Sequence, residues 1–429
     1  MGAITPIVVV VAMLLNEGQD NDRDEAVSQS LDVTRVVVVG AGHSGGAFVL
    51  ALRKLGFRGA IDLVGDETEL PYERPSLSKD MLTGGNSAQP VLLADSGRWL
   101  ECCSLHLDTS ATRIDLARRH VHLASDGVLP YDVLILATGA VVRQLPLPPH
   151  PRIQTLRSSA DARAIRAMAA QSRSVAIVGG GVIGLEVAAS LRTNGLAVDV
   201  IESGPRLMGR NAPAGPASWI AALHRDQGVA VHLGASLKEV SVDTGPIGLL
   251  LSDGRSLTSD FVVVGIGVAP CVSLAEAAGL PCNDGVLVNR DYTSVADPSV
   301  VVIGDAAARV GQDGGQPVRQ ETWAHAQTSA QAAARAILGL EPEPEDVPWF
   351  WTTQYGRTLQ IAGQLDNGDD VISRGDGCEL YIRGGAVAGV ACLDRPRDFA
   401  AARRLIGAKS VIDPCRAADM AIDLRKVAA

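Results

Sequence analysis

The sequence has few aromatic residues and no excess of basic residues. Aromatic side chains make up 3% of the 429 residues, whereas hydrophobic residues reach 47% and glycine occurs 45 times. This composition is typical of α/β proteins, and the length suggests two or three domains. The formal net charge of −10 argues against general nucleic-acid binding, which requires a basic surface.

The sequence also lacks any C-x-x-C pair and any clustered Cys/His spacing, so we expect no metal site. The cysteine count is odd and the chain is long, which disfavours a disulfide framework. The pattern favours a reduced, cytoplasmic protein. The seven cysteines are Cys102, Cys103, Cys271, Cys282, Cys378, Cys392 and Cys415.

The apolar run near the N-terminus, residues 7–15, is too short to span a bilayer, which takes about 20 residues. No basic residue precedes it and no small-residue cleavage site follows, so a secretory signal is not indicated. The polar stretch after it is typical of disorder. We therefore expect a disordered extension over residues 1–31 and no association with a membrane.

A valine-rich strand leads into a glycine-rich turn at residues 40–45, and a helical pattern then runs to about residue 55. The next strand, residues 60–65, is followed by Asp66, which lies 26 residues after Gly40. In such βαβ units the glycines let a pyrophosphate approach the helix N-terminus, and the acid binds ribose hydroxyls. This segment predicts a dinucleotide site.

The same pattern recurs at residues 175–195. Gly179 opens the second turn, and the following strand ends in Glu202, which lies 23 residues later. One glycine motif alone is weak support, because an α/β turn can need glycine only for packing. Two motifs, each between a strand and a helix and each with a terminal acid, predict two dinucleotide sites.

Three further strands end in glycine-containing turns, at residues 131–140, 260–270 and 300–307. Ligands bind at the C-terminal ends of strands in open α/β sheets, so we expect Asp305 to contact a ligand. The alternative role for this residue is a helix N-cap. After the Pro/Glu-rich segment 338–348, shorter strand patterns and a helical pattern predict a small α+β domain.

Residues 32–429 resemble the FAD- and NADH-dependent ferredoxin reductases of bacterial oxygenase systems. The resemblance implies two Rossmann-like domains of the glutathione-reductase type and a C-terminal α+β interface domain. The implied boundaries are 32–143 with 272–340 for FAD, 144–271 for NADH and 341–429 for the last domain. The blocks that carry the resemblance include "LVGDETELPYERPSLSKDML" (63–82), "GGGVIGLEVAASL", "VVIGDAA", "VRQETWAHAQTSAQAAARAILG" (318–339) and "PWFWTTQYGRTLQIAG" (348–363).

The resemblance assigns FAD to the first glycine unit and NADH to the second. It implies that Lys79 lies beside the flavin and is held by an ion pair to Glu186; without the resemblance, a surface lysine at a helix start would be the preferred interpretation. The implied cofactor-binding residues are Gly40, Gly42, Ser44, Asp66, Arg74, Lys79, Ala111, Ala137, Thr138, Gly139, Arg157, Gly181, Ile183, Gly184, Glu202, Gly265, Gly304, Asp305 and Trp323.

The segment after "PY" has no cysteine, so a thiol relay of the disulfide-reductase kind has no obvious residue. The resemblance implies instead a small, acidic iron–sulfur ferredoxin as acceptor, serving a ring-hydroxylating dioxygenase or a cytochrome P450. A homodimer is left open. An NADH oxidase or disulfide reductase and an apoptosis-inducing-factor-like flavoprotein are the alternatives. The candidate docking residues are Arg319, Trp349, Phe350, Trp351, Arg403 and Arg404.

Overall fold

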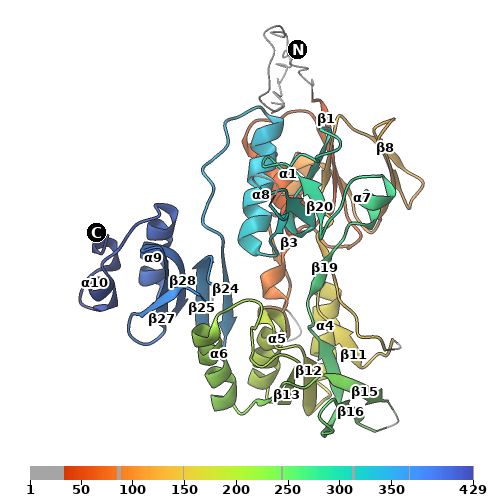
Figure 1. Ribbon diagram of the computed structural model, residues 1–429. Coiled ribbons are helices and arrows are strands. Elements are labelled where there is room, and N and C mark those ends of the chain that lie inside the picture. The colour runs from red at the N-terminus through yellow and green to blue at the C-terminus, as the bar shows by residue number, and fades with distance from the viewer. Residues whose placement is uncertain are drawn as a thin grey trace. The chain divides into compact units, whose positions relative to one another are not determined.

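The computed structural model describes residues 33–84, 88–147, 149–242, 245–311, 315–366 and 368–428. The extension expected at residues 1–31 lies outside these ranges. The chain forms two compact units, and the elements of each can be followed in Figure 1. Unit 1 comprises Met1–Glu73, Val91–Val141 and Ala269–Pro344, and unit 2 comprises Arg74–Pro90, Val142–Val268 and Glu345–Ala429.

Unit 1 is built on a five-stranded parallel sheet in the order β21-β9-β1-β2-β5. Valine and leucine dominate its central strands because both faces of a parallel sheet are buried. The chain adds β2 and β5 on one side of β1 and then β9 and β21 on the other, so the strand order reverses between β1 and β9. The strands are β1 (Arg35–Val39), β2 (Ala60–Val64), β5 (Ser104–His106), β9 (Val133–Leu136) and β21 (Val300–Val302).

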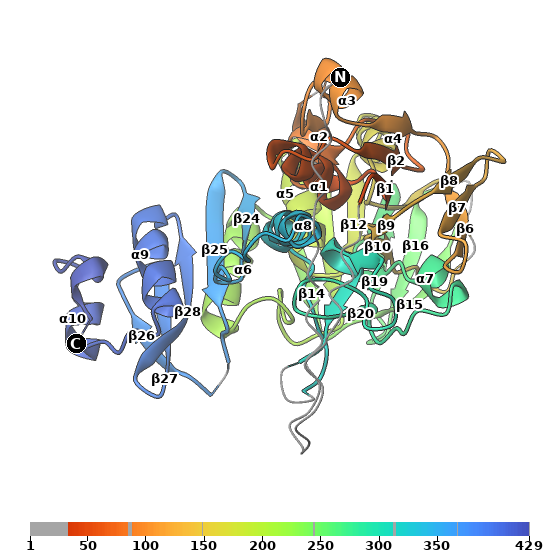
Figure 2. The same ribbon diagram turned by 90° about the horizontal axis from the view of Figure 1, so that it is seen from above.

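Two helices far apart in the sequence, α1 (His43–Lys54) and α8 (Trp323–Ile337), pack against each other in unit 1 (Figure 1 and Figure 2). Oγ of Ser44 in α1 donates to the carbonyl oxygen of Ala326 in α8 at 3.3 Å. The remaining elements of unit 1 are β3 (Tyr72–Glu73), β4 (Val91–Leu92), α3 (Ser96–Cys102), β6 (Ala111–Asp115), β7 (His120–Leu123), β8 (Val128–Pro130), α7 (Ser273–Ala277), β20 (Val286–Val288), η3 (Gly304–Ala306), β22 (Ala307–Arg309) and β23 (Val318–Arg319).

Unit 2 contains a second five-stranded parallel sheet, in the order β11-β18-β12-β13-β14. Its order reverses between β12 and β18, as the first sheet reverses between β1 and β9. The strands are β11 (Ile153–Thr155), β12 (Ser174–Val178), β13 (Ala197–Glu202), β14 (Ala230–Leu233) and β18 (Phe261–Val264). Around them lie η1 (Arg74–Ser76), α2 (Asp80–Thr83), α4 (Ser159–Ala169), α5 (Val182–Thr193), α6 (Ala214–Asp226) and the hairpin strands β15 (Leu237–Ser241), β16 (Ile247–Leu251) and β17 (Ser256–Ser259).

The C-terminal part of unit 2 is an antiparallel sheet in the order β24-β25-β28-β27-β26, against which α9 packs (Figure 2). Phe399 and Leu405 of α9 are buried against Leu380 and Val390 of the sheet. The elements are β24 (Trp349–Gln354), β25 (Arg357–Gly363), β26 (Asp370–Ser373), β27 (Cys378–Arg383), β28 (Ala386–Leu393), α9 (Pro396–Gly407), α10 (Pro414–Ala418) and η5 (Leu424–Lys426).

The predicted fold class, two Rossmann-like domains and a small α+β domain, is confirmed. The strand expected over residues 131–140 is interrupted, because Gly139 adopts a φ of +68° between β9 and β10 (Ala140–Val142). The strand expected over 260–270 is likewise divided into β18 and β19 (Val268–Pro270). Within the described residues, no helix has both the length and the apolar composition needed to cross a bilayer.

Candidate functional sites

The first glycine turn lies where the strand order of unit 1 reverses. Gly40 follows β1 with a φ of +115°, and a Cβ there would lie 2.2 Å from the carbonyl oxygen of Ala137 at the end of β9. A Cβ at Gly45 would lie 2.0 Å from the carbonyl oxygen of Gly40. Helix α1 begins next, with Gly42 as an N-cap that has no side chain to occupy the first amide groups. These amides are therefore available to a phosphate.

The second glycine turn repeats this geometry in unit 2. Gly179 has a φ of +112°, and a Cβ there would lie 2.3 Å from the carbonyl oxygen of Gly265 after β18. A Cβ at Gly184 would lie 2.2 Å from the carbonyl oxygen of Gly179. Gly181 caps α5 without a side chain and faces open space, and Ile183 is 47% exposed beside it. Both turns thus have the shape that fits a dinucleotide pyrophosphate.

The two candidate ribose-binding acids are held differently. Glu202, the last residue of β13, accepts hydrogen bonds from the amides of Gly180 (2.7 Å) and Gly204 (2.6 Å), so its carboxylate is fixed beside the second turn. Asp66 lies two residues beyond β2 and is exposed. The carboxylate of neighbouring Glu67 accepts from the hydroxyl of Tyr72 at 2.6 Å. Sequence spacing alone could not separate a fixed acid from an exposed one.

In unit 1, the α1 N-terminus meets two segments from late in the chain. A Cβ at Gly304 would lie 2.9 Å from Oγ of Ser44, so the turn that carries Asp305 lies directly against α1. The ring of His43 lies 5.3 Å from the ring of Trp323, the first residue of α8. The structure therefore brings together three residues that were predicted from separate blocks: Ser44, Gly304 and Trp323. His43 was not predicted, although its position inside the turn was a usable signal.

Two hydrogen bonds to the backbone of Cys271 hold the loop after β9. Oγ1 of Thr138 donates to the carbonyl oxygen of Cys271 at 2.7 Å, and the amide of Cys271 donates to the carbonyl oxygen of Gly139 at 2.9 Å. Ala111 stands apart at the start of β6, in the antiparallel sheet β6-β7-β8. The cofactor contacts expected of these residues stay predictions.

The ion pair expected between Lys79 and Glu186 is present in unit 2. Lys79 precedes α2, and its ammonium donates to Oε2 of Glu186 at 2.6 Å. Glu186 belongs to the second turn of α5 and its side chain is 2% exposed, whereas that of Lys79 is 22% exposed. A carboxylate at this depth requires such partners. The role of the pair beside a flavin stays a prediction.

Two residues that contact Glu186 were not predicted. Oγ of Ser78 donates to Oε2 at 2.5 Å, and Oγ1 of Thr352 donates to Oε1 at 2.7 Å. Both residues lie inside the blocks "PSLSK" and "PWFWTTQYG", so the blocks contained the signal although the pairing of distant segments was not evident.

Arg74 and Arg157 are brought together as well. The guanidinium of Arg74 donates to the main-chain carbonyl of Arg157 at 2.5 Å, and the amide of Arg157 donates to the carboxylate of Asp161 at 2.9 Å. Asp161 also completes a capping box with Ser158 at the start of α4. The contact of the two arginines with FAD phosphates stays a prediction.

One candidate docking residue was misjudged. Arg319 was a basic docking candidate, with an exposed helix residue as the alternative, but its side chain is 7% exposed and it lies in strand β23. Its guanidinium forms ion pairs with Asp284 (3.2 Å) and Glu321 (2.7 Å) in unit 1. Because its charge is neutralised by these two acids, Arg319 serves the structure of unit 1 and is not a free docking cation.

The aromatic docking candidates lie at the start of the C-terminal sheet. Trp349 stacks on Trp351 with ring centroids 5.4 Å apart, and the guanidinium of Arg403 lies 5.1 Å from the centre of the Trp349 ring. Arg403 also forms an ion pair with Asp346 at 2.5 Å, whereas Arg404 is exposed. Phe350 is half-buried.

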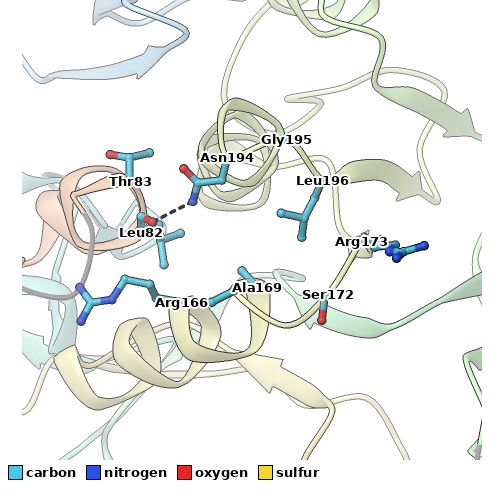
Figure 3. A pocket seen from close by; sticks show the side chains of 10 residues that line it. Leu82, Thr83, Arg166, Ala169, Ser172, Arg173, Asn194, Gly195 and Leu196 are labelled. Carbon is cyan, nitrogen blue, oxygen red and sulfur yellow. Dashed lines mark hydrogen bonds between the residues drawn. The ribbon is translucent and has the colours of Figure 1, made fainter.

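Unit 2 also has a pocket of about 680 Å³ between α2, α4 and the C-terminal end of α5 (Figure 3). Asn194 donates to the carbonyl oxygen of Leu82 at its rim (2.9 Å), and the side chain of Arg173 points away from it. None of the residues predicted from the sequence lines this pocket.

Two family models match the chain, one over the segment that contains both glycine turns and one over the C-terminal sheet. Residues 34–333 match the model of the pyridine nucleotide-disulphide oxidoreductases, and residues 349–428 match that of the reductase C-terminal domain. The ferredoxin reductase component of chlorobenzene dioxygenase from Cupriavidus sp. (strain PS12) is 36% identical over 400 residues, covering 91% of this chain and 97% of that protein. Rhodocoxin reductase from Rhodococcus erythropolis is 34% identical, covering 91% and 93%.

Solved structures give the same result. The ferredoxin reductase for the CYP199A2 system from Rhodopseudomonas palustris has a TM-score of 0.88 and 33% identity, covering 92% of this chain and all of that one. The covalent putidaredoxin reductase–putidaredoxin complex has a TM-score of 0.86 and 31% identity, covering 92% of this chain and 97% of that one. The chain therefore belongs to the pyridine nucleotide-disulphide oxidoreductase family and, within it, to the ferredoxin reductases of oxygenase systems.

Proposed function

We propose that the protein passes electrons from NADH through FAD to the iron–sulfur ferredoxin of an oxygenase system, either a ring-hydroxylating dioxygenase or a cytochrome P450. The observation that carries this proposal is the pair of equivalent turns at Gly40 and Gly179, each at a strand-order reversal and each closed to any residue larger than glycine. One chain with two such turns is suited to hold a donor and an acceptor dinucleotide.

The first turn is the proposed FAD site. Gly40, Gly42 and Ser44 would receive the pyrophosphate at the start of α1, Asp305 would face the ribityl chain, and Trp323 would lie beside the flavin ring. The uncapped backbone amides at the start of α1 and the glycines around them support this proposal. When bound, FAD supplies the conversion of a two-electron donation into two single-electron transfers, which an iron–sulfur partner requires.

The second turn is the proposed NADH site. Gly181, Ile183 and Gly184 would receive the pyrophosphate, and Glu202 would accept hydrogen bonds from the adenosine ribose. Its carboxylate is already oriented by the amides of Gly180 and Gly204. A fixed negative charge there favours NADH, because it repels the 2′-phosphate of NADPH.

The described thiols do not support a disulfide-reducing mechanism. Burial raises the pKa of Cys103 to about 12, and the pKa of Cys282 is also raised, mainly by burial. Cys378 and Cys392 are fully buried in the C-terminal sheet. A thiol is nucleophilic only as its thiolate, so these residues are poorly suited to a relay. Cys102, Cys103, Cys282, Cys378, Cys392 and Cys415 form no disulfide, which fits our proposal of a reducing, cytoplasmic location.

The proposed partner is a small, acidic ferredoxin. Among the residues of the docking prediction, Arg404 is exposed, and the stacked Trp349 and Trp351 are half-buried. A cation beside flat aromatic surface attracts an acidic partner and gives it an apolar contact. A homodimer stays a prediction.

The discriminating experiment compares acceptors with the FAD-loaded protein. We expect NADH oxidation with ferricyanide and with a [2Fe–2S] ferredoxin from an oxygenase system, and negligible oxidation with oxidised glutathione or coenzyme A disulfide. Turnover on the disulfides that equals turnover on ferredoxin would overturn the proposal. Slow turnover on every acceptor would favour an apoptosis-inducing-factor-like role.

A further inference from the structure

The buried carboxylate of Glu186 is hydrogen-bonded on both oxygens. Oε2 accepts from Ser78 and Lys79, whereas Oε1 accepts from Thr352 of β24 at 2.7 Å. The Thr352 side chain is completely buried. The strand that opens the C-terminal sheet thus supplies one of the three side-chain donors to the carboxylate that holds Lys79.

The contacts continue from Thr352 into the interior of unit 2. Nε2 of Gln354 lies 3.0 Å from Oγ1 of Thr352, and Oε1 of Gln354 lies 2.7 Å from Nε2 of His224 on α6. The hydroxyl of Tyr355 lies 3.1 Å from Nδ1 of the same histidine. Gln354 and His224 are no more than 1% exposed, so water does not compete for these bonds.

These bonds have only one consistent direction. Because the Thr352 hydroxyl donates to a carboxylate, it accepts from the amide NH₂ of Gln354, whose oxygen is left to accept from Nε2–H of His224. Nδ1 of His224 then accepts from Tyr355. Burial lowers the pKa of His224, in keeping with the neutral ring that this pattern requires. Each donor therefore points toward Glu186.

We propose that Thr352 and Gln354 are positioning residues, which hold the Glu186 carboxylate in one orientation and through it hold the ammonium of Lys79. This inference rests on the proposed function, in which Lys79 serves the flavin. Thr352 and Gln354 are two residues apart and so share one face of β24, whereas Thr353 faces the other side and contacts Thr358 at 3.0 Å. Thr353 is thus a matched control on the same strand.

Removal of the Thr352 hydroxyl should loosen the ion pair. Without it, Oε1 of a buried carboxylate has lost its donor, and the carboxylate turns toward other partners. The ammonium of Lys79 then loses its fixed partner and changes its surroundings. A role limited to packing would give no such change when only a hydroxyl is exchanged for a methyl group.

The sequence allows a direct measurement on Lys79, because the chain has five lysines: Lys54, Lys79, Lys238, Lys409 and Lys426. The other four are exposed. Reductive methylation of the FAD-loaded protein with ¹³C-formaldehyde gives one NMR signal for each lysine, and a Lys79→Arg variant assigns the signal of Lys79. The chemical shift of this signal reports the surroundings of the Lys79 ammonium, and stopped flow on unmodified protein reports flavin reduction by NADH.

We expect Thr352→Val to move the NMR signal of Lys79 toward the signals of the four exposed lysines and to slow flavin reduction about tenfold, the range for one hydrogen bond to a charged group. Thr352→Ser, which keeps the hydroxyl, should restore the position of the signal and bring the rate to within about twofold of the wild type, and Thr353→Val should change neither. Gln354→Leu should act in the same direction with a smaller effect, because Thr352 still reaches Glu186.

An unchanged Lys79 signal in Thr352→Val would overturn the inference, as would an equal displacement of the signal in Thr352→Ser. If Thr352→Val does not bind FAD, Gln354→Leu supplies the same test. The NMR measurement is independent of the acceptor. Failure to reduce any ferredoxin would therefore count against the proposed function and leave the Lys79 result to decide the positioning role.

Discussion

At the scale of single residues, the proposed role of Glu202 is to select the nicotinamide cofactor at the second turn. We expect kcat/KM for NADH to exceed that for NADPH at least about tenfold, because a fixed carboxylate accepts from ribose hydroxyls and repels a phosphate. The guanidinium of neighbouring Arg206 donates to the carbonyl oxygens of Gly209 and Ala212. Steady-state kinetics with both cofactors tests this, and Glu202→Gln should reduce the preference. Comparable efficiency with NADPH would contradict it.

Lys79 carries the second residue-scale prediction. The Lys79→Ala variant should keep FAD but reduce its flavin with NADH at least about tenfold more slowly, because the ammonium that accompanies the buried Glu186 is lost. Stopped-flow absorbance of the flavin measures the rate, and the exposed Lys238→Ala is the control. An unchanged rate in Lys79→Ala would show that the lysine has a structural role alone.

At the scale of elements, the contact between the second turn and helix α5 tolerates only glycine at its tightest point. A methyl group at Gly184 would lie 2.2 Å from the carbonyl oxygen of Gly179, so Gly184→Ala should displace α5 and lower the melting temperature by several degrees. A methyl group at Gly181 would have no other atom within 4 Å, so Gly181→Ala causes no clash. It should keep the melting temperature and raise KM for NADH. Thermal unfolding and NADH titration of both variants test this contrast, which equal melting temperatures would refute.

The elements around the glycine turns could be predicted from the sequence because their signals are local. Valine-rich strands, glycine spacing and helical periodicity lie within about 20 residues of one another at both turns. Strand β24 was missed as an element, since "WFWTTQ" has no clear alternation of apolar and polar residues.

Contacts between distant segments could not be predicted in this way. The burial of Arg319 depends on Asp284, 35 residues earlier, and Thr352 reaches Glu186 across 166 residues. Charge and hydroxyl groups give no sign in the sequence of which distant partner neutralises them. The ion pair of Lys79 and Glu186 was predicted only because the family resemblance supplied it.

At the scale of the whole molecule, buried histidines make stability depend on pH. Burial lowers the pKa of His325 to about 4, so the folded protein keeps this ring neutral while the unfolded chain protonates it below its ordinary pKa of about 6.5. The neutral ring therefore contributes up to about 3 kcal/mol to the free energy of unfolding above pH 6.5. This contribution is lost as the pH falls toward 4. Burial also lowers the pKa of His224.

The measurement is the melting temperature of the wild type and of His325→Gln between pH 7.5 and 4.5. We expect the wild type to lose stability more steeply over this range, because glutamine does not titrate. The acids that titrate below pH 5 are common to both proteins and cancel in the difference. Parallel curves would mean that His325 is protonated in the folded state.

The segment Arg74–Pro90, which leaves unit 1 and packs in unit 2, constrains how this enzyme can be recombined with its relatives. Unit 1 is assembled from three separate stretches of chain, so exchanging it requires several junctions in frame. The stretch from Glu345 to the C-terminus needs a single junction, but it brings its own Thr352 and Gln354 to a Glu186 that stays behind. A hybrid reductase built at that junction would take its C-terminal sheet from one parent and the side chains that hold Lys79 from both.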